Sequence, residues 1–384
     1  MALAAERLRT RLADSFPSAW RAIAARVPRH AFIPDTVWIE DGDGPVPIRR
    51  GDDPERWLDA CYADRPLITQ LDDGDDSGRG YITSSASKPS IVADMLQAAE
   101  VRPGMRVLEI GSGTGWNAAL LAARTGPDRV TTIEVDPSLA DHARRSLGAA
   151  GWRVAVVTGD GTRGHAPGAP FDRVLSTAAV QRVPSAWVEQ TAAGGQILTP
   201  WGTTFHNGVL ARLAVHGDGT ASGRFTGNAA FMWIRGQRRP HAVVEEQVLP
   251  EHDYTEHRTD LHPYEPIGDF DARFAIGLRM PTGAGEVVVF DGDRPGDPNF
   301  TVYLMAPETG SWAEWRITPD SAGAYRVRQH GPRRLFDELC AAYQWWQRLG
   351  RPRRDRFGLT ATTGGDQTVW IDDPAHPASE TDRH

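Results

Sequence analysis

Between residues 90 and 201 the chain alternates between short apolar runs and helical patterns, and this alternation constrains the fold more than any other feature. Strands that are apolar throughout must be covered on both faces, which is typical of a parallel sheet flanked by helices. Right-handed crossovers between such strands give a doubly wound, Rossmann-like α/β domain. The predicted strands are MRVLEIG, RVTTIEV, RVAVVTGD, FDRVLST and GGQILTP.

The length of 384 residues predicts more than one domain. The Gly/Asp/Pro-rich stretch from residue 41 to 80 is expected to form loops, broken by a short strand near Leu67. The runs VLARLAV, GRFTG and FMWI are expected to close the α/β sheet, and Gly364-Gly365 predicts a late hairpin. The predicted order is a helical and loop extension (1–80), the α/β domain (81–240), a polar linker (241–266) and a smaller α+β domain (267–384).

Composition narrows the class of protein. A formal net charge of −8 disfavours a nucleic-acid partner. The two cysteines, Cys61 and Cys340, are too few for a disulfide framework and fit a reducing cytoplasm. No apolar run approaches the ~20 residues of a membrane span, and the N-terminus lacks the apolar core of a signal peptide. The histidines show no metal-ligand spacing, so we expect a cytoplasmic protein without a metal site.

A glycine-rich turn follows the first strand of the α/β domain and opens the next helix. Glycine is needed there because the backbone turns sharply and a ligand must approach without a clash against Cβ. The spacing is G-x-G-x-G, with Trp116 where a dinucleotide motif has its last glycine, which disfavours NAD and FAD. The turn suits a ligand without a pyrophosphate, whose amino-acid tail lies over it. Its predicted contacts are Gly111, Ser112, Gly113, Thr114 and Gly115.

Two acidic residues stand at the ends of the next two strands. Glu134 follows Gly115 by 19 residues and can accept both hydroxyls of a ribose, with Val135 beside it. Asp160 can contact an adenine amino group, and Gly161 lets the backbone lie near the ring. Ligands of such sheets bind beyond the carboxyl ends of the strands, so the turn and both acids are expected to converge on one nucleoside.

Seven segments occur in an order that matches a known family: VPRHAF-IP, SSASKPSIVADML, VLEIGSGTGW, IEVDPSLADHAR, GDGTRG, FDRVLSTAAVQRVP and AAGGQILTPWG. Over residues 20 to 240 they resemble the protein-L-isoaspartate O-methyltransferases. The resemblance implies S-adenosylmethionine as cofactor, S-adenosylhomocysteine as its product, and cofactor roles for the residues above. It also places Glu109 next to the sulfonium and Ser87 beside the reacting methyl, with Ser85 close by. Ser84, Thr177 and Ala178 would contact the substrate.

The sequence departs from that family in several places. Ser90 stands where the family often has His or Tyr, and Trp116 replaces a cofactor Tyr. An acidic insertion occupies residues 41 to 80, and a further domain follows residue 240, where the repair enzymes end. This longer architecture resembles a branch found with lanthipeptides, lasso peptides and graspetides, in which an aspartate of a modified ribosomal peptide is methylated. The C-terminal domain is then a candidate for peptide recruitment.

Methyl transfer to a carboxylate needs no general base, because the nucleophile, with an unperturbed pKa of about 3.9 for Asp, is already ionised at neutral pH. Alignment and fixed donors that replace water can supply catalysis. A hydroxyl such as that of Ser87 can hold one carboxylate oxygen while the other attacks. The predicted function is therefore methylation of an aspartate side chain in a modified ribosomal peptide, whose ester then cyclises to aspartimide.

Other hypotheses about the function stay open. The nearest is L-isoaspartyl protein repair; a catalytically inactive scaffold and a small-molecule O-methyltransferase are further options. Intact Glu109, Glu134 and Asp160 oppose the scaffold, and the family segments oppose the small molecule. On the last helix, Tyr343, Trp345 and Trp346 can anchor a peptide or form core, and the basic run 348–356 can bind a peptide or face solvent.

Overall fold

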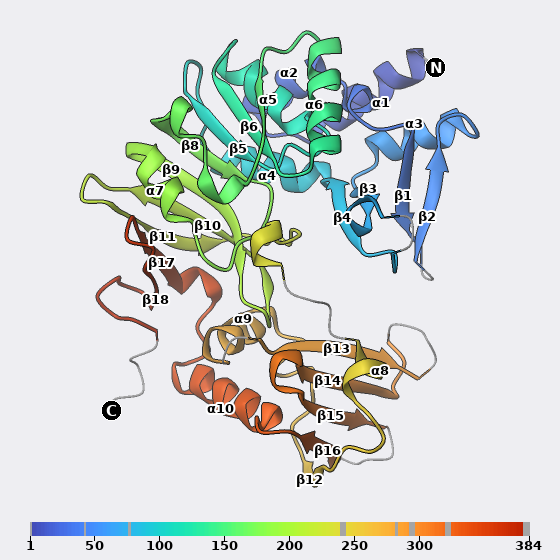
Figure 1. Cartoon of the computed structure of the whole chain (residues 1–384), viewed down its shortest axis with the longest axis vertical. Helices are drawn as coiled ribbons and strands as arrows, with labels where there is room; N and C mark the ends of the chain where they lie inside the picture. Colours follow the sequence, from blue (N-terminus) through green and yellow to red (C-terminus); the bar gives the residue numbers. More distant parts are fainter. Residues whose placement is uncertain are drawn as a thin grey trace.

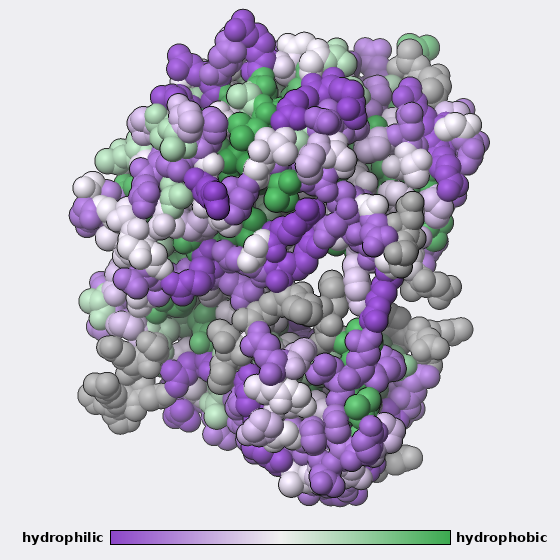
Figure 2. Space-filling model, in the orientation of Figure 1, coloured by the Kyte–Doolittle hydropathy of each residue, from purple (hydrophilic) through white to green (hydrophobic). Residues whose placement is uncertain are grey.

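The computed structural model describes residues 2–41, 44–75, 78–238, 243–280, 283–291, 296–318 and 324–378. Its strands form three sheets, which are arranged in two lobes (Figure 1). The face drawn in Figure 2 is mainly hydrophilic, and a hollow opens between the upper and the lower lobe on the right of the view. Both expected classes of domain are present, a Rossmann-like α/β domain and a smaller α+β domain.

The α/β domain is built on a nine-stranded sheet of order β18-β17-β11-β10-β9-β8-β5-β6-β7. Strands β5 to β9 are parallel to their sheet neighbours within this set, and antiparallel pairing begins where β9 meets β10. All four residues of β5 are buried, as expected of a strand covered on both faces. The strands are β5 (Val107–Ile110), β6 (Val130–Glu134), β7 (Ala155–Thr158), β8 (Phe171–Ser176), β9 (Thr191–Gly202), β10 (Asn207–Val215) and β11 (Thr220–Thr226).

Helices cover the faces of this sheet as the sequence predicts. The start of α6 shows how a local signal fixes an element: Asp136 accepts hydrogen bonds from the backbone N–H groups of Ser138 (2.9 Å) and Leu139 (3.2 Å), and Pro137 takes the first helical position. The helices are α4 (Pro89–Ala98), α5 (Trp116–Thr125), α6 (Pro137–Ala149) and α7 (Ser185–Gln190).

The predicted short strand near Leu67 is present as β3, but the N-terminal extension differs from the rest of the prediction, because β3 belongs to a four-stranded antiparallel sheet of order β2-β1-β3-β4. Short alternating runs pair here between turns rich in glycine and aspartate, and those turns hid the strands in the sequence. The last strand reaches into the region predicted as the α/β domain. The elements are α1 (Ala2–Asp14), α2 (Ser18–Arg26), β1 (Thr36–Glu40), β2 (Pro45–Arg49), α3 (Pro54–Tyr62), β3 (Leu67–Leu71) and β4 (Ile82–Ala86).

The prediction that FMWI is a strand was wrong. Residues 229–238, which we name the strap, leave the sheet after β11 and make a single bridge, from Trp233 to Ala179. The Ala179 N–H donates to Met232 O at 2.8 Å, and the Ile234 N–H donates to Ala179 O at 2.9 Å. An apolar run of this length has the composition of a strand, and only the tertiary fold takes it across the end of the sheet.

The lower lobe holds a five-stranded antiparallel sheet of order β12-β16-β15-β14-β13. The predicted linker is not only a linker, because it contributes α8 (Val244–Gln247) and the edge strand β12 (Thr255–Thr259). The predicted boundary between residues 240 and 241 lies outside the described residues. The remaining elements are α9 (Phe270–Arg279), β13 (Gly285–Phe290), β14 (Phe300–Ala306), β15 (Ser311–Ile317), β16 (Tyr325–His330) and α10 (Leu335–Arg348).

The end of the chain returns to the upper lobe. The predicted hairpin across Gly364-Gly365 is present as β17 (Phe357–Thr362) and β18 (Gln367–Ile371), but it extends the α/β sheet, not the lower sheet. Strand β17 pairs antiparallel with β11, with Ala221 opposite Ala361. The stretch predicted as one C-terminal domain is therefore shared between two sheets.

The aromatic face of α10 belongs to the core. Trp345 is 2% exposed, Trp346 is 4% exposed and Tyr343 is 5% exposed, which favours the packing interpretation over a peptide anchor. In the basic run after this helix, Arg354 pairs with Asp271 at 2.7 Å.

We expect Leu359→Ala to lower the free energy of unfolding by about 2–4 kcal/mol, because Leu359 on β17 is fully buried and the substitution leaves a cavity. Thr368→Ala, at an exposed position of the same hairpin, should change stability by no more than about 0.5 kcal/mol. Urea unfolding of both variants measures the difference. Equal losses would show that the hairpin does not contribute to the core.

Candidate active site

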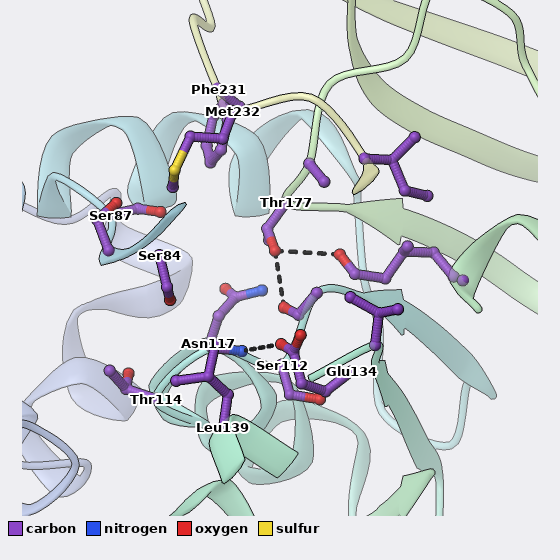
Figure 3. A pocket seen from close by; sticks show the side chains of 18 of the residues that line it. Ser84, Ser87, Ser112, Thr114, Asn117, Glu134, Leu139, Thr177, Phe231 and Met232 are labelled. Atoms are coloured by element: carbon purple, nitrogen blue, oxygen red, sulfur yellow. Dashed lines mark hydrogen bonds between the residues drawn. The ribbon is translucent and has the colours of Figure 1, made fainter. Parts of the chain in front are cut away.

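A cavity opens at the carboxyl ends of β5, β6 and β8, beneath the strap (Figure 3). It encloses about 1030 Å³ including its open mouth, at the upper end of the range for small-molecule pockets. Of the residues predicted to bind cofactor or substrate, most line it: Ser84, Ser85, Ser87, Gly111, Ser112, Gly113, Thr114, Glu134, Val135, Gly161, Thr177 and Ala178.

The glycine turn adopts a backbone that side chains rarely allow. Gly111, Gly113 and Gly115 have φ angles of 91°, 49° and 87°, all in the left-handed region. A Cβ on Gly113 would find only Ser85 O nearby, at 3.9 Å, so this position faces open cavity across from the serine segment. Gly115 instead starts α5 and packs against Ala143, so it shapes the turn without lining the cavity.

Glu134 lies at the end of β6 with a 7% exposed side chain. Its Oε2 accepts a hydrogen bond from the Gly113 N–H at 2.9 Å, and its Oε1 accepts one from the Asp136 N–H at 3.2 Å. Burial raises the pKa of Glu134, while these backbone donors oppose that rise. The carboxylate is thus held rigidly at the cavity wall, where an acceptor for two vicinal hydroxyls would be needed.

The position of Glu109 next to the sulfonium stays a prediction. Glu109 is fully buried and does not line the cavity, because its carboxylate accepts hydrogen bonds from Asn117 Nδ2 and Thr132 Oγ1, both at 2.6 Å. The Thr132 hydroxyl also contacts Ser112 Oγ at 2.8 Å. Glu109 therefore supports two cavity residues from behind, one of which, Asn117, sequence reasoning missed.

Asp160 also does not line the cavity. Its carboxylate is exposed and accepts a hydrogen bond from the Thr162 N–H at 2.9 Å, so only Gly161 of this pair lines the wall. A Cβ on Gly161 would meet Ile110 Cγ2 at 2.6 Å, which explains the need for glycine there. Contact between Asp160 and an adenine amino group stays a prediction.

The serine segment, residues 84–87, comprises the end of β4 and the start of its connection to α4, on the side of the cavity opposite Glu134 (Figure 3). Ser84 is buried and accepts a hydrogen bond from Thr69 Oγ1 at 3.0 Å. Thr177 donates from Oγ1 to Gly111 O at 2.8 Å, which ties the end of β8 to the glycine turn. The residues predicted to contact the substrate therefore share one cavity with the glycine turn.

Arg29, in the VPRHAF motif, holds the serine segment from behind. Its guanidinium is fully buried and donates to three backbone carbonyls, those of Cys61 (2.7 Å), Ala86 (3.1 Å) and Ser87 (3.0 Å). It also lies 5.4 Å from the ring of Trp116, the first residue of α5. Burial lowers the pKa of Arg29 to about 10, so the side chain stays charged at neutral pH. The motif is part of the family resemblance, but no role was predicted for Arg29 within it.

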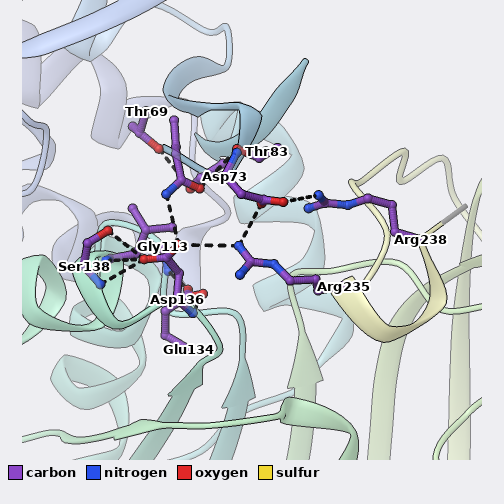
Figure 4. A network of polar contacts seen from close by, with 12 residues as sticks. Thr69, Asp73, Thr83, Gly113, Glu134, Asp136, Ser138, Arg235 and Arg238 are labelled. Carbon is purple, nitrogen blue, oxygen red and sulfur yellow. Dashed lines mark hydrogen bonds and ion pairs between the residues drawn. The ribbon is translucent and has the colours of Figure 1, made fainter. Parts of the chain in front are cut away.

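The strap is fastened over the cavity by charge. Asp73, in the acidic insertion, pairs with Arg235 and with Arg238 of the strap, both at 2.8 Å (Figure 4). Arg235 also lies 3.5 Å from Asp136, which accepts a hydrogen bond from Gln70 at 3.1 Å. We call this group the clasp. No local sequence pattern predicts it, because the partners in each of its contacts are separated by more than 60 residues.

The site combines a carboxylate held at a strand end, a tight glycine turn and a row of hydroxyls. Among the described residues, no histidine, lysine or cysteine lines the cavity. This arrangement fits a nucleoside with an amino-acid tail and a reaction without proton abstraction. Fold and site together define the class of Rossmann-like methyltransferases.

Comparison with known proteins identifies the family. The family model for protein-L-isoaspartate(D-aspartate) O-methyltransferase matches residues 52–238. A protein-L-isoaspartate O-methyltransferase of Methanopyrus kandleri is 36% identical over 215 residues, which cover 55% of this chain and 81% of the relative. One of Thermococcus sibiricus is 39% identical over 216 residues, covering 55% of this chain and 83% of the relative. The chain belongs to this family, and it is a carboxyl O-methyltransferase that uses S-adenosylmethionine.

The fold also has a solved counterpart over both lobes. A structure named protein-L-isoaspartate O-methyltransferase aligns with 96% of this chain and 99% of its own, with a TM-score of 0.52 and 21% identity. At that identity the likeness concerns the fold alone. Within the part of the chain that the structure describes, no helix combines the length and apolarity that a bilayer crossing requires.

We expect Glu134→Gln to weaken binding of S-adenosylhomocysteine about 10- to 100-fold, because a charged acceptor worth about 1.5–3 kcal/mol is lost. Titration calorimetry measures the change, and Glu189→Gln, at an exposed site on α7, should bind like the wild type. Unchanged affinity in Glu134→Gln would remove this carboxylate from the cofactor site.

Burial raises the pKa of Glu109 from 4.5 to about 7, so the folded chain holds this proton more tightly than the unfolded chain. Its contribution to stability is fully present below pH ~4.5 and is lost as pH rises through ~7. Relative to Glu109→Gln, the wild type should therefore lose on the order of 2 kcal/mol between pH 5 and pH 8. Urea unfolding of both proteins across this range tests it, and parallel pH profiles would contradict it.

Proposed function

We propose that this enzyme methylates the free carboxylate of an acidic residue within a peptide or protein, and that L-isoaspartyl residues are its substrates. The observation that carries this proposal is the position of the serine segment, which faces the glycine turn across one cavity. The names of the relatives support the isoaspartyl form of the acid. The cavity offers hydroxyl groups where an anionic oxygen would need donors.

When bound, S-adenosylmethionine supplies an electrophilic methyl group. The hydroxyls of Ser85 and Ser87 would donate to one oxygen of the substrate carboxylate and leave the other free to attack. The buried charge of Arg29 lies behind Ser87 and adds a positive potential that favours an anion in front of it. The strap lines part of the cavity and would displace water from a bound carboxylate, whose hydration the fixed donors would replace. No residue has to remove a proton.

A second substrate is the aspartate side chain of a modified ribosomal peptide, as the longer architecture led us to expect. In that reaction the neighbouring backbone nitrogen attacks the methyl ester and expels methanol, which closes an aspartimide ring. The clasp favours this narrower substrate, because Asp73 of the insertion fastens the strap over the site and restricts access. The presence of the C-terminal domain does not distinguish the two proposed substrates, because a solved structure that bears the repair enzyme's name shares the two-lobed fold. Peptide recruitment by this domain and a cytoplasmic location stay predictions.

Two peptides distinguish these substrates: a linear isoaspartyl peptide, and a cyclic peptide that presents an ordinary aspartate. We expect methylation of the isoaspartyl peptide, seen as a gain of 14 Da by mass spectrometry. Methylation of the cyclic aspartyl peptide, followed by a loss of 32 Da, would establish the second substrate in its place. No gain on either peptide would overturn both.

In the same assay we expect Ser87→Ala to lower kcat/KM about 10- to 100-fold, because a hydrogen bond to a charged oxygen is worth about 1.5–3 kcal/mol. Ser90→Ala is the matched control, since Ser90 lies three residues along but outside the cavity lining. Equal activities of the two variants would mean that Ser87 does not hold the carboxylate.

A further inference from the structure

A second hollow opens directly beside the active-site cavity. Ser85, Ser87, Phe231 and Met232 line both spaces, so the two adjoin at the serine segment. We name this hollow the side groove. Its walls are mainly apolar and come from three parts of the chain: Pro66, Ile68, Ile82, Ile91, Phe231 and Met232.

The side groove is also lined by charged residues. Arg65 is one of them and donates from Nη2 to Glu40 O at 3.2 Å. Lys88 also lines it, with Nζ 3.4 Å from Asp64 Oδ2. The groove encloses about 1090 Å³ including its open mouth, so an apolar side chain has room against its apolar walls beside these polar groups.

A carboxylate held by Ser87 belongs to a residue whose chain neighbours must leave the cavity. The groove begins at Ser85 and Ser87, so a side chain adjacent to the reacting residue reaches it without crossing the strap. Burying an apolar side chain there removes apolar surface from water on both partners. A charged side chain would lose hydration against the apolar walls, and the two cations that line the groove are already engaged, Arg65 with Glu40 O and Lys88 with Asp64.

We propose that the side groove is a specificity subsite that binds an apolar side chain directly next to the methylated residue of the peptide substrate. The subsite rests on the proposed function, because it requires a peptide as the methyl acceptor. The subsite distinguishes peptides by the residue next to the methylated acid. Neither the cofactor site nor the serine hydroxyls contact that neighbouring residue. The strap contributes to it through Phe231 and Met232, so one segment covers the reacting centre and selects its neighbour.

The test compares kcat/KM for isoaspartyl peptides that carry Leu, Gly or Glu before or after the reacting residue. We expect the Leu peptide of one of these two positions to exceed its Gly counterpart by about tenfold, as burial of an aliphatic side chain implies. The Glu peptide of that position should be the poorest.

Ile82→Lys supplies the decisive comparison, because Ile82 lines only the side groove and is half-buried. We expect this variant to lose the preference for Leu and to methylate the Glu peptide several-fold better than the wild type does. Improved activity on one peptide cannot come from misfolding. Val288→Lys, at an exposed apolar position on β13, should leave all ratios unchanged.

Equal kcat/KM for Leu, Gly and Glu peptides at both positions would overturn the subsite while leaving the proposed function intact. A Leu preference that survives Ile82→Lys unchanged would also overturn it. Absence of methylation on every peptide would instead defeat the proposed function, so the two failures are distinguishable.

Discussion

The site depends on one carboxylate and the two backbone N–H groups that hold it. Glu134 accepts from Gly113 and from Asp136, so it links the glycine turn after β5 to the start of α6. Asp136 continues the connection through Arg235 to Asp73 and fastens the strap. Backbone donors hold both carboxylate oxygens of this largely buried anion in place. The glycine turn and the strap are therefore both positioned relative to Glu134.

On the substrate side, a second buried charge likewise holds separate segments in place. Arg29 binds the carbonyls of Ala86 and Ser87 and lies against Trp116, so the serine segment and the first residue of α5 keep a set separation. An in-line methyl transfer needs such a separation, because misplacement of reacting atoms by an ångström is costly in rate. The two walls of the cavity are thus positioned by separate polar groups, both supported from within the core.

The cofactor side of this site could be predicted because its signals are local. A buried strand, a glycine turn and an acid at the next strand end are contiguous in sequence, and parallel strands bring their carboxyl ends to one edge. Asp160 was placed at the cavity by the same reasoning and Glu109 by the family resemblance, yet Glu109 accepts hydrogen bonds from Asn117 and Thr132, and Asp160 caps its own turn. Strand position fixes where a residue stands but not which hydrogen bond its side chain takes.

The sequence by itself determined the Rossmann-like domain, the glycine turn, the placement of the serine segment beside a helix and the late hairpin. Tertiary structure alone decided that this hairpin extends the first sheet, that FMWI becomes a cover and that the acidic insertion fastens it. The physical reason is the distance along the chain over which each signal acts. Periodicity and turn chemistry act within a few residues, whereas the pairing of β11 with β17 and of Asp73 with Arg235 joins segments far apart in the chain, whose meeting depends on how the whole core packs.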